Sequence, residues 1–74
     1  MDKEIDLRGL YCPTPILRTR EEMDAAKLGD ILIVIADDPA AEEDLKRWAN
    51  RTGQKVLNIE KSGKELKVTI KKVK

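Results

Sequence analysis

Residues 31–39 read ILIVIADDP, and this stretch decides the fold. Its first six residues are apolar, mostly β-branched and too few for a helix, which is typical of a central strand flanked by others. Asp38 and Pro39 then indicate a helix start, because a carboxylate caps free N–H groups and proline suits the first helical position. The stretch therefore predicts a buried strand over 31–36 that leads into a helix.

Patterns on either side of this strand predict the other elements. Alternating apolar residues indicate a short strand that ends before Gly9, and apolar spacing predicts a helix over 13–27. The second helix should end at Gly53. Two more strands are expected at 56–61 and 65–72, around a Ser-Gly-Lys hairpin loop. The residues expected on the inner faces of the two helices are Ile16, Thr19, Met23, Ala26, Ala41, Leu45, Trp48 and Ala49.

The predicted order is βαβαββ, and 74 residues leave room for only one domain, over residues 1–74. We expect a two-layer α/β sandwich (α+β) with two helices on one sheet face. The central strand is apolar on both faces, although only one face can meet the helices. One alternate set of its side chains must therefore look outward as a partly exposed apolar strip, usable by a partner or for self-association. The candidate sets are Ile31, Ile33 and Ile35, or Leu32 and Val34.

Composition limits the class of function. Lys and Arg number 15 and Asp and Glu 14, and a net charge of +1 argues against strong binding to nucleic acid or anionic membrane. Residues 54–74 hold 7 basic and 2 acidic side chains, which more often form a solvated edge than a docking surface. The N-terminus is charged where a signal peptide would be apolar, and no stretch could span a membrane. We therefore expect a cytoplasmic protein.

The single cysteine, Cys12, lies between the first strand and the first helix. The helix dipole and unpaired N–H groups favour a thiolate there, so the pKa of the thiol should fall from about 8.5. Pro13 and Pro15 fit a first helical turn and fix the helix start. Without histidine or a second cysteine, a protease-like pair, a zinc site and a CxxC cycle are excluded, and no cofactor or metal is expected. A thiol that accepts and releases sulfur is one hypothesis, and a buried inert cysteine is the alternative.

The segments Asp6-Leu7-Arg8-Gly9-Leu10 and Cys12-Pro13-Thr14-Pro15 resemble the CPxP signature of the TusA-type (SirA-like) sulfur-carrier family. The similarity spans the whole chain and includes the IADDP stretch at 35–39 and Trp48. It implies that Cys12 bears a covalent persulfide, with Pro13 and Pro15 as the motif prolines. It also implies a mixed four-stranded sheet, as in the C-terminal domain of translation initiation factor three.

The resemblance further implies two kinds of partner protein. A cysteine desulfurase or a rhodanese-like sulfurtransferase would donate sulfur, and an acceptor enzyme would receive it, so the chain would be a carrier rather than a stand-alone catalyst. Acceptors in such families serve tRNA thiolation, molybdenum cofactor assembly or sulfur metabolism, and some relatives work beside transporters of sulfur compounds. Thr14 stands where tRNA-thiolation members carry an acidic residue, which leaves the pathway open.

Four other residues are candidates for supporting roles: Arg8, Gly9, Asp37 and Asp38. If the first two strands are parallel, the loops that follow them share one sheet edge, and both aspartates lie near Cys12. Either aspartate could orient a partner, although Asp38 could instead cap a helix. Arg8 could attract the persulfide or an acidic partner, or simply be solvated.

Two other functions stay open at this point, a nucleic-acid-binding module and a regulatory module whose cysteine is incidental. The first has little support, because only Tyr11 and Trp48 are available for base stacking, and Trp48 is expected in the core.

Overall fold

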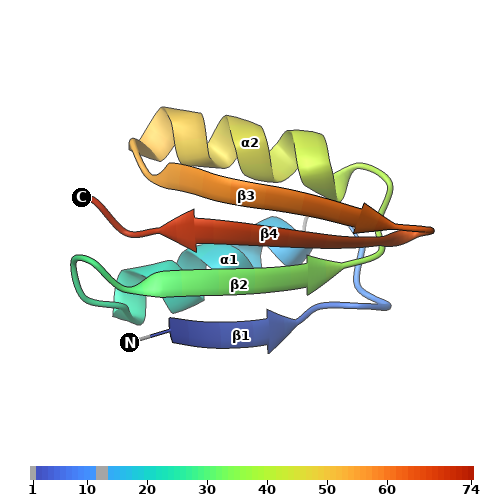
Figure 1. Ribbon diagram of the computed structural model, residues 1–74, viewed down its shortest axis with the longest axis horizontal. Coiled ribbons are helices and arrows are strands. Elements are labelled where there is room, and N and C mark those ends of the chain that lie inside the picture. Colours follow the sequence, from blue (N-terminus) through green and yellow to red (C-terminus); the bar gives the residue numbers. More distant parts are fainter. Residues whose placement is uncertain (1, 12–13) are drawn as a thin grey trace.

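The computed structural model describes residues 2–11 and 14–74, which form a four-stranded sheet with two helices. The order βαβαββ is confirmed, and the sheet order is β1-β2-β4-β3 (Figure 1). Strand β1 pairs with β2 in parallel, whereas β2 with β4 and β4 with β3 are antiparallel, so the sheet is mixed as expected. The bounds are β1 Asp2–Asp6, α1 Thr14–Ala25, β2 Ile31–Ala36, α2 Ala41–Thr52, β3 Lys55–Ser62 and β4 Glu65–Lys71.

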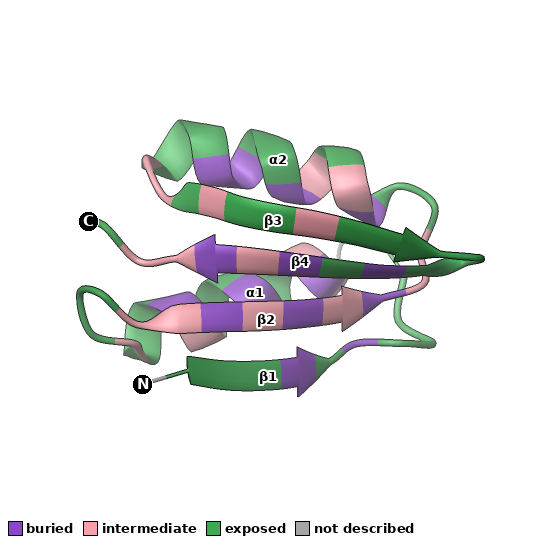
Figure 2. Cartoon of the chain, viewed as in Figure 1, coloured by how far each residue is buried: buried purple, intermediate pink, exposed green. Residues whose placement is uncertain are grey.

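Both helices cover the same face of the sheet, and the core lies between the two layers (Figure 1). Leu32, Val34 and Ala36 are buried on this face of β2, while the alternate residues of the strand are only half-buried (Figure 2). The outward-looking set is therefore Ile31, Ile33 and Ile35, and the predicted apolar strip is confirmed.

The inner faces of the helices largely match the predicted ones. Trp48 is 4% exposed and anchors the core from α2, together with Ala41, Leu45 and Ala49. In α1, Thr19 and Met23 are buried, and Ile16 packs against the core from its edge. Gly53 ends α2 with a positive φ of 80°, as predicted from the preference of this position for glycine.

Helix α1 is shorter at its C-terminal end than the predicted 13–27. The Lys27 N–H donates to the Asp30 carboxylate, 3.0 Å away, instead of continuing the helical ladder. The ammonium of Lys72 donates to the carbonyls of Met23 and Ala26, 2.8 Å from each. A cation thus satisfies carbonyls at the negative end of the helix dipole and stabilises the early end of the helix.

Helix α2 begins two residues later than predicted. The Asp38 carboxylate accepts the N–H of Ala40 at 3.0 Å, which closes a turn over Pro39. Ala40 is therefore the N-cap, and the expectation that Pro39 occupies the first helical position was wrong. Three acidic residues in the first turn, Glu42, Glu43 and Asp44, still place negative charge where the helix dipole is positive.

Over residues 2–11 and 14–74, no helix is both long and apolar enough to cross a membrane.

The Thr19 hydroxyl is buried and has no hydrogen-bond partner among the described residues. Thr19→Val keeps the shape and removes the desolvated oxygen, so it should raise the free energy of unfolding by about 1 kcal/mol. Chemical denaturation measures this gain. In the matched control Thr52→Val, the lost hydroxyl donates to the Trp48 carbonyl at 2.8 Å, so no gain is expected there. A loss of stability in Thr19→Val would contradict the prediction.

Candidate functional site

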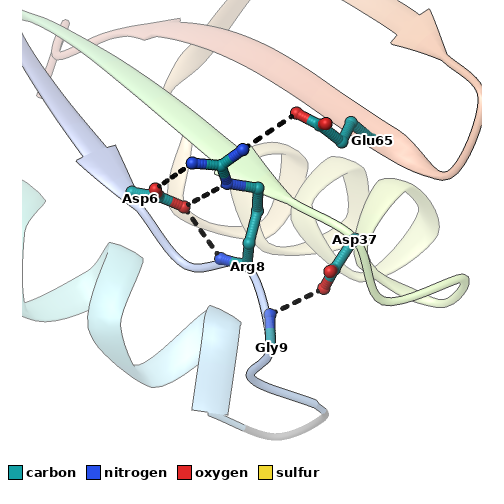
Figure 3. Close-up of polar contacts among 5 residues, drawn as sticks. All are labelled: Asp6, Arg8, Gly9, Asp37 and Glu65. Carbon is teal, nitrogen blue, oxygen red and sulfur yellow. Dashed lines mark hydrogen bonds and ion pairs between the residues drawn. The ribbon is translucent and has the colours of Figure 1, made fainter.

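The loops after β1 and β2 leave the sheet at one edge and are joined by a hydrogen bond. Parallel pairing places both strand ends together, and the Leu7 N–H extends the ladder to the Ile35 carbonyl at 2.7 Å. Beyond it, the Gly9 N–H donates to Oδ1 of Asp37 at 2.8 Å (Figure 3). Asp37 therefore holds the loop that leads to residue 12. The sequence had suggested only that Asp37 could orient a partner.

Gly9 adopts a backbone conformation that favours glycine, in addition to donating a hydrogen bond. Its φ of 84° lies in the left-handed region, where a side chain is strained and glycine is not. Because Gly9 turns the chain away from β1, its N–H can face the Asp37 carboxylate. The predicted supporting role of Gly9 thus has a conformational basis, although its effect on chemistry stays a prediction.

Arg8 is held by two carboxylates rather than pointing freely into solvent. Its Nε and Nη2 donate to Oδ1 and Oδ2 of Asp6 at 2.9 and 2.6 Å, and its Nη1 lies 3.5 Å from Glu65 (Figure 3). Its backbone N–H also donates to Asp6, at 3.1 Å. A bidentate pair of this kind fixes orientation, since a guanidinium matches the plane of a carboxylate.

The pairing changes the ionisation of both groups. The side-chain hydrogen bond from Arg8 lowers the pKa of Asp6 from 3.8 to about 2, with help from the Arg8 backbone N–H. The same bond raises the pKa of Arg8 above its ordinary value, with smaller contributions from the charges of Asp6 and Glu65. Arg8 therefore stays charged and engaged, and it ties the end of β1 to the first residue of β4.

Cys12 and Pro13, the predicted persulfide carrier and the first motif proline, lie outside the described residues. The residues on either side of them are described. Tyr11 is 61% exposed, its carbonyl accepts the Thr14 N–H at 2.9 Å, and helix α1 starts at Thr14. Pro15 is buried within this first helical turn, as its predicted position requires. The lowered pKa of the Cys12 thiol stays a prediction, and so does its accessibility to partner proteins, with a buried inert cysteine as the alternative.

A cavity of about 520 Å³ opens beside Tyr11, at the sheet edge where these loops meet. Its walls come from the end of β2, the first turn of α2 and the β3–β4 hairpin. Glu42 in one wall binds Lys46 at 2.9 Å and also pairs with Lys61, and the hydrogen bonds from these lysines lower the pKa of the Glu42 carboxyl. The lining residues are Tyr11, Asp37, Asp38, Pro39, Glu42, Lys61, Gly63, Lys64, Glu65 and Leu66.

The predicted site residues are thus only partly brought together. Asp37 contacts Gly9 directly, and Asp38 shares a cavity with Tyr11, next to Cys12 in the chain. Asp38 also accepts the Ala40 N–H in the turn ahead of α2, but Ala40 is the N-cap and no side-chain hydrogen bond caps this helix, so the prediction that Asp38 caps it was wrong. Sequence reasoning missed Glu65, because nothing in the local pattern signals a partner 57 residues away. The Asp6–Arg8 pair had a local signal, since residues two apart on a strand share a face.

Comparison with known proteins identifies the family. The family model described as "Sulfurtransferase TusA" matches residues 3–72, a range that contains Cys12 and both prolines. The chain belongs to the TusA family of sulfur carriers.

Individual relatives agree with this membership of the TusA family. The chain is 38% identical to sulfur carrier protein TusA of Allochromatium vinosum over 71 residues, which are 96% of this chain and 93% of the relative. A protein of Archaeoglobus fulgidus is 42% identical over 59 residues, or 80% of this chain and 77% of that one. The crystal structure of a SirA-like protein from Desulfitobacterium hafniense matches with a TM-score of 0.83 at 25% identity, and each chain is covered completely.

The Asp6–Arg8 pair predicts an acid titration with a definite sign. A carboxyl whose folded pKa is depressed contributes stability above its ordinary value of 3.8 and loses that contribution as pH falls toward about 2. Carbon-13 NMR of the side-chain carboxyl should give an Asp6 midpoint near 2, and Arg8→Gln should shift the midpoint upward. A wild-type midpoint at 3.8 would show that the pair does not form.

Asp37 should protect the Gly9 amide through its hydrogen bond. Asp37→Ala removes the acceptor, so Gly9 hydrogen exchange should accelerate about fivefold or more, the equivalent of about 1 kcal/mol. Asp37→Asn keeps an Oδ1 acceptor and should retain most of the protection. Asp24→Ala on the exposed face of α1 serves as the control. Equal exchange in the wild type and Asp37→Ala would remove Asp37 from the loop.

Proposed function

We propose that this chain carries sulfur as a persulfide on Cys12, between a donor protein and an acceptor enzyme. The observation that supports this most directly is membership of the TusA family over residues 3–72, with the CPxP cysteine of the motif at position 12. The lone thiol and the lack of histidine agree with a carrier that uses partner proteins for the remaining chemistry. It would therefore be a carrier rather than a stand-alone catalyst.

Loading is a displacement between sulfur atoms. The Cys12 thiolate attacks the outer sulfur of a donor persulfide, a bond forms between Sγ and that sulfur, and the S–S bond of the donor breaks. The donor cysteine leaves as a thiolate, and the proton on the outer sulfur moves with it or passes to solvent. One sulfur atom is transferred from the donor cysteine to Cys12 without net oxidation, so no external oxidant or reductant is required.

The described residues support this role by holding the loop and leaving its end accessible. Asp37 fixes the loop at Gly9, and Arg8 fixes the strand end through Asp6. Tyr11 is 61% exposed and Leu10 37%, so two apolar side chains directly before Cys12 are available to a docking protein. A loop that is held in place before a partner binds reduces the orientational cost of transfer between two proteins.

The proposed partners are those that membership of the TusA family implies. A cysteine desulfurase or a rhodanese-like sulfurtransferase presents a protein persulfide and is the proposed donor. An enzyme of tRNA thiolation, molybdenum cofactor assembly or sulfur metabolism is the proposed acceptor. A cytoplasmic location belongs to the same proposal, because a reducing compartment keeps the thiol available.

Mass spectrometry of the intact chain tests the proposal. After incubation with a cysteine desulfurase and cysteine, the wild type should gain the mass of one sulfur atom, and a reducing agent should remove it. Cys12→Ser should gain nothing under the same conditions. A rhodanese-like donor with thiosulfate provides a second arm, since donor specificity differs between carriers. No added sulfur from either donor, in a chain whose thiol still reacts with iodoacetamide, would rule out the carrier function.

A further inference from the structure

The sheet face without helices carries one column of outward side chains from each of its four strands, and the columns differ in chemistry. The register places one residue of each column side by side, so that Ile33 lies between Glu4 and Thr69. The acidic column on β1 is Asp2, Glu4 and Asp6. The apolar column on β2 is Ile31, Ile33 and Ile35. The lysine column on β4 is Lys67, Thr69 and Lys71, and Glu65 begins the same column. Beyond it lies a mixed column on β3, which includes Lys55, Asn58 and Glu60.

The charges of Asp2 and Glu4 in the acidic column and of Lys67 and Lys71 in the lysine column do not neutralise each other within one chain. Neighbouring strands are about 4.8 Å apart, so the acidic and lysine columns are separated by roughly 10 Å, with the apolar column between them. Within residues 2–11 and 14–74, no ion pair involves Glu4, Lys67 or Lys71. Asp6 is the exception in the acidic column, since it binds Arg8. The face therefore presents two separated strips of opposite charge along an apolar centre.

From this arrangement we infer that the open face binds a second copy of the chain, with a two-fold axis parallel to β2. Rotation about such an axis lays the acidic column of each copy over the lysine column of the other. The apolar columns meet at the centre, and Asp2 then lies opposite Lys71 of the second copy. A self-complementary surface of this kind is what a two-fold dimer requires.

The order of the columns selects this axis over the alternative. A two-fold axis perpendicular to the strands would place acidic column on acidic column and lysines on lysines, and like charges in contact oppose association. The parallel axis keeps the direction of the strands, so both copies of β1 and β2 end at the same end of the dimer. The two loops that begin after β1 would then lie at the same end of the dimer.

The size of the face predicts a weak dimer. Three strands overlap when the axis follows β2, and at about 4.8 Å spacing, with some six residues each at about 3.3 Å, they give a contact of roughly 15 by 20 Å. This is a footprint of about 300 Å² on each copy and about 600 Å² for both, below the size of most specific interfaces. Half-buried isoleucines also contribute less apolar area than fully exposed ones would. The dimer should therefore dissociate on dilution.

Sedimentation equilibrium tests the dimer across concentrations from about 10 µM to about 1 mM, which bracket a weak association. The wild type should show a reversible monomer–dimer equilibrium. One variant, Asp2→Lys/Glu4→Lys, turns the acidic column basic, so that it matches the lysine column. The other variant, Lys67→Glu/Lys71→Glu, turns the lysine column acidic, so that it matches the acidic column. Each alone should dimerise at least about tenfold more weakly, because like charges then face each other.

Mixing the two variants gives the decisive result. In a heterodimer of the two variants, basic columns of one chain face acidic columns of the other at both positions. Heterodimers should therefore form at least as strongly as the wild-type homodimer. A chain with all four substitutions exchanges the columns and should regain its homodimer. Circular dichroism and thermal melting confirm that each variant is folded, since all four side chains lie on the sheet surface.

The control Arg20→Glu/Arg47→Glu changes the net charge by as much on the helix side and should dimerise like the wild type. Cys12→Ser should also dimerise normally, which separates this inference from the sulfur-carrier function. A wild type that stays monomeric at the highest concentration overturns the inference. The open face would then be a candidate binding surface for a different protein. Dimerisation that is equal in both column variants overturns it as well.

Discussion

Strand β2 is paired along both edges, and this constraint organises the molecule. Its parallel partner β1 pairs with it over residues 31–35, and its antiparallel partner β4 pairs with it over residues 31–36. Because β1 and β2 run in the same direction, the chain must leave both strands at one edge of the sheet, where the loop before Cys12 meets the loop of Asp37 and Asp38. The location of the site is thus a consequence of strand direction, as in other proteins with parallel pairs.

Charged side chains around the site are used to hold backbone in place. Arg8 is engaged by Asp6 and Glu65, and Asp37 accepts a backbone N–H, so these charges fix the approach to Cys12 before any partner arrives. This arrangement differs from a binding site whose charged side chains are unpaired until a ligand binds. An exposed ion pair contributes little to global stability. A bidentate pair at the end of a strand nevertheless limits the conformations of the loop that follows.

Sequence patterns predicted the elements well and the side-chain roles less well. The apolar run at 31–36 and the alternation in β4 determine the sheet, since burial on one face requires a period of two. The start of α2 was misplaced because Asp38 and Pro39 suit a turn as well as a cap, and here the N–H groups of Ala40 and Ala41 both donate to Asp38 within such a turn. Lys72, Glu65 and Asp37 act across distances that no local pattern encodes. The structure describes neither Cys12 nor Pro13, so the central residue still depends on family membership and chemistry.

The position of β4 has a consequence for how the chain acquires its structure. This strand is the last of the four to be synthesised, yet it lies inside the sheet between β2 and β3, and Lys72 just after it closes the end of α1. Until residues 65–72 have left the ribosome, β3 has no neighbour and β2 has an open apolar edge. The sheet should therefore assemble in one cooperative event once β4 is available, and the unpaired strand edges of the nascent chain are exposed to aggregation until then.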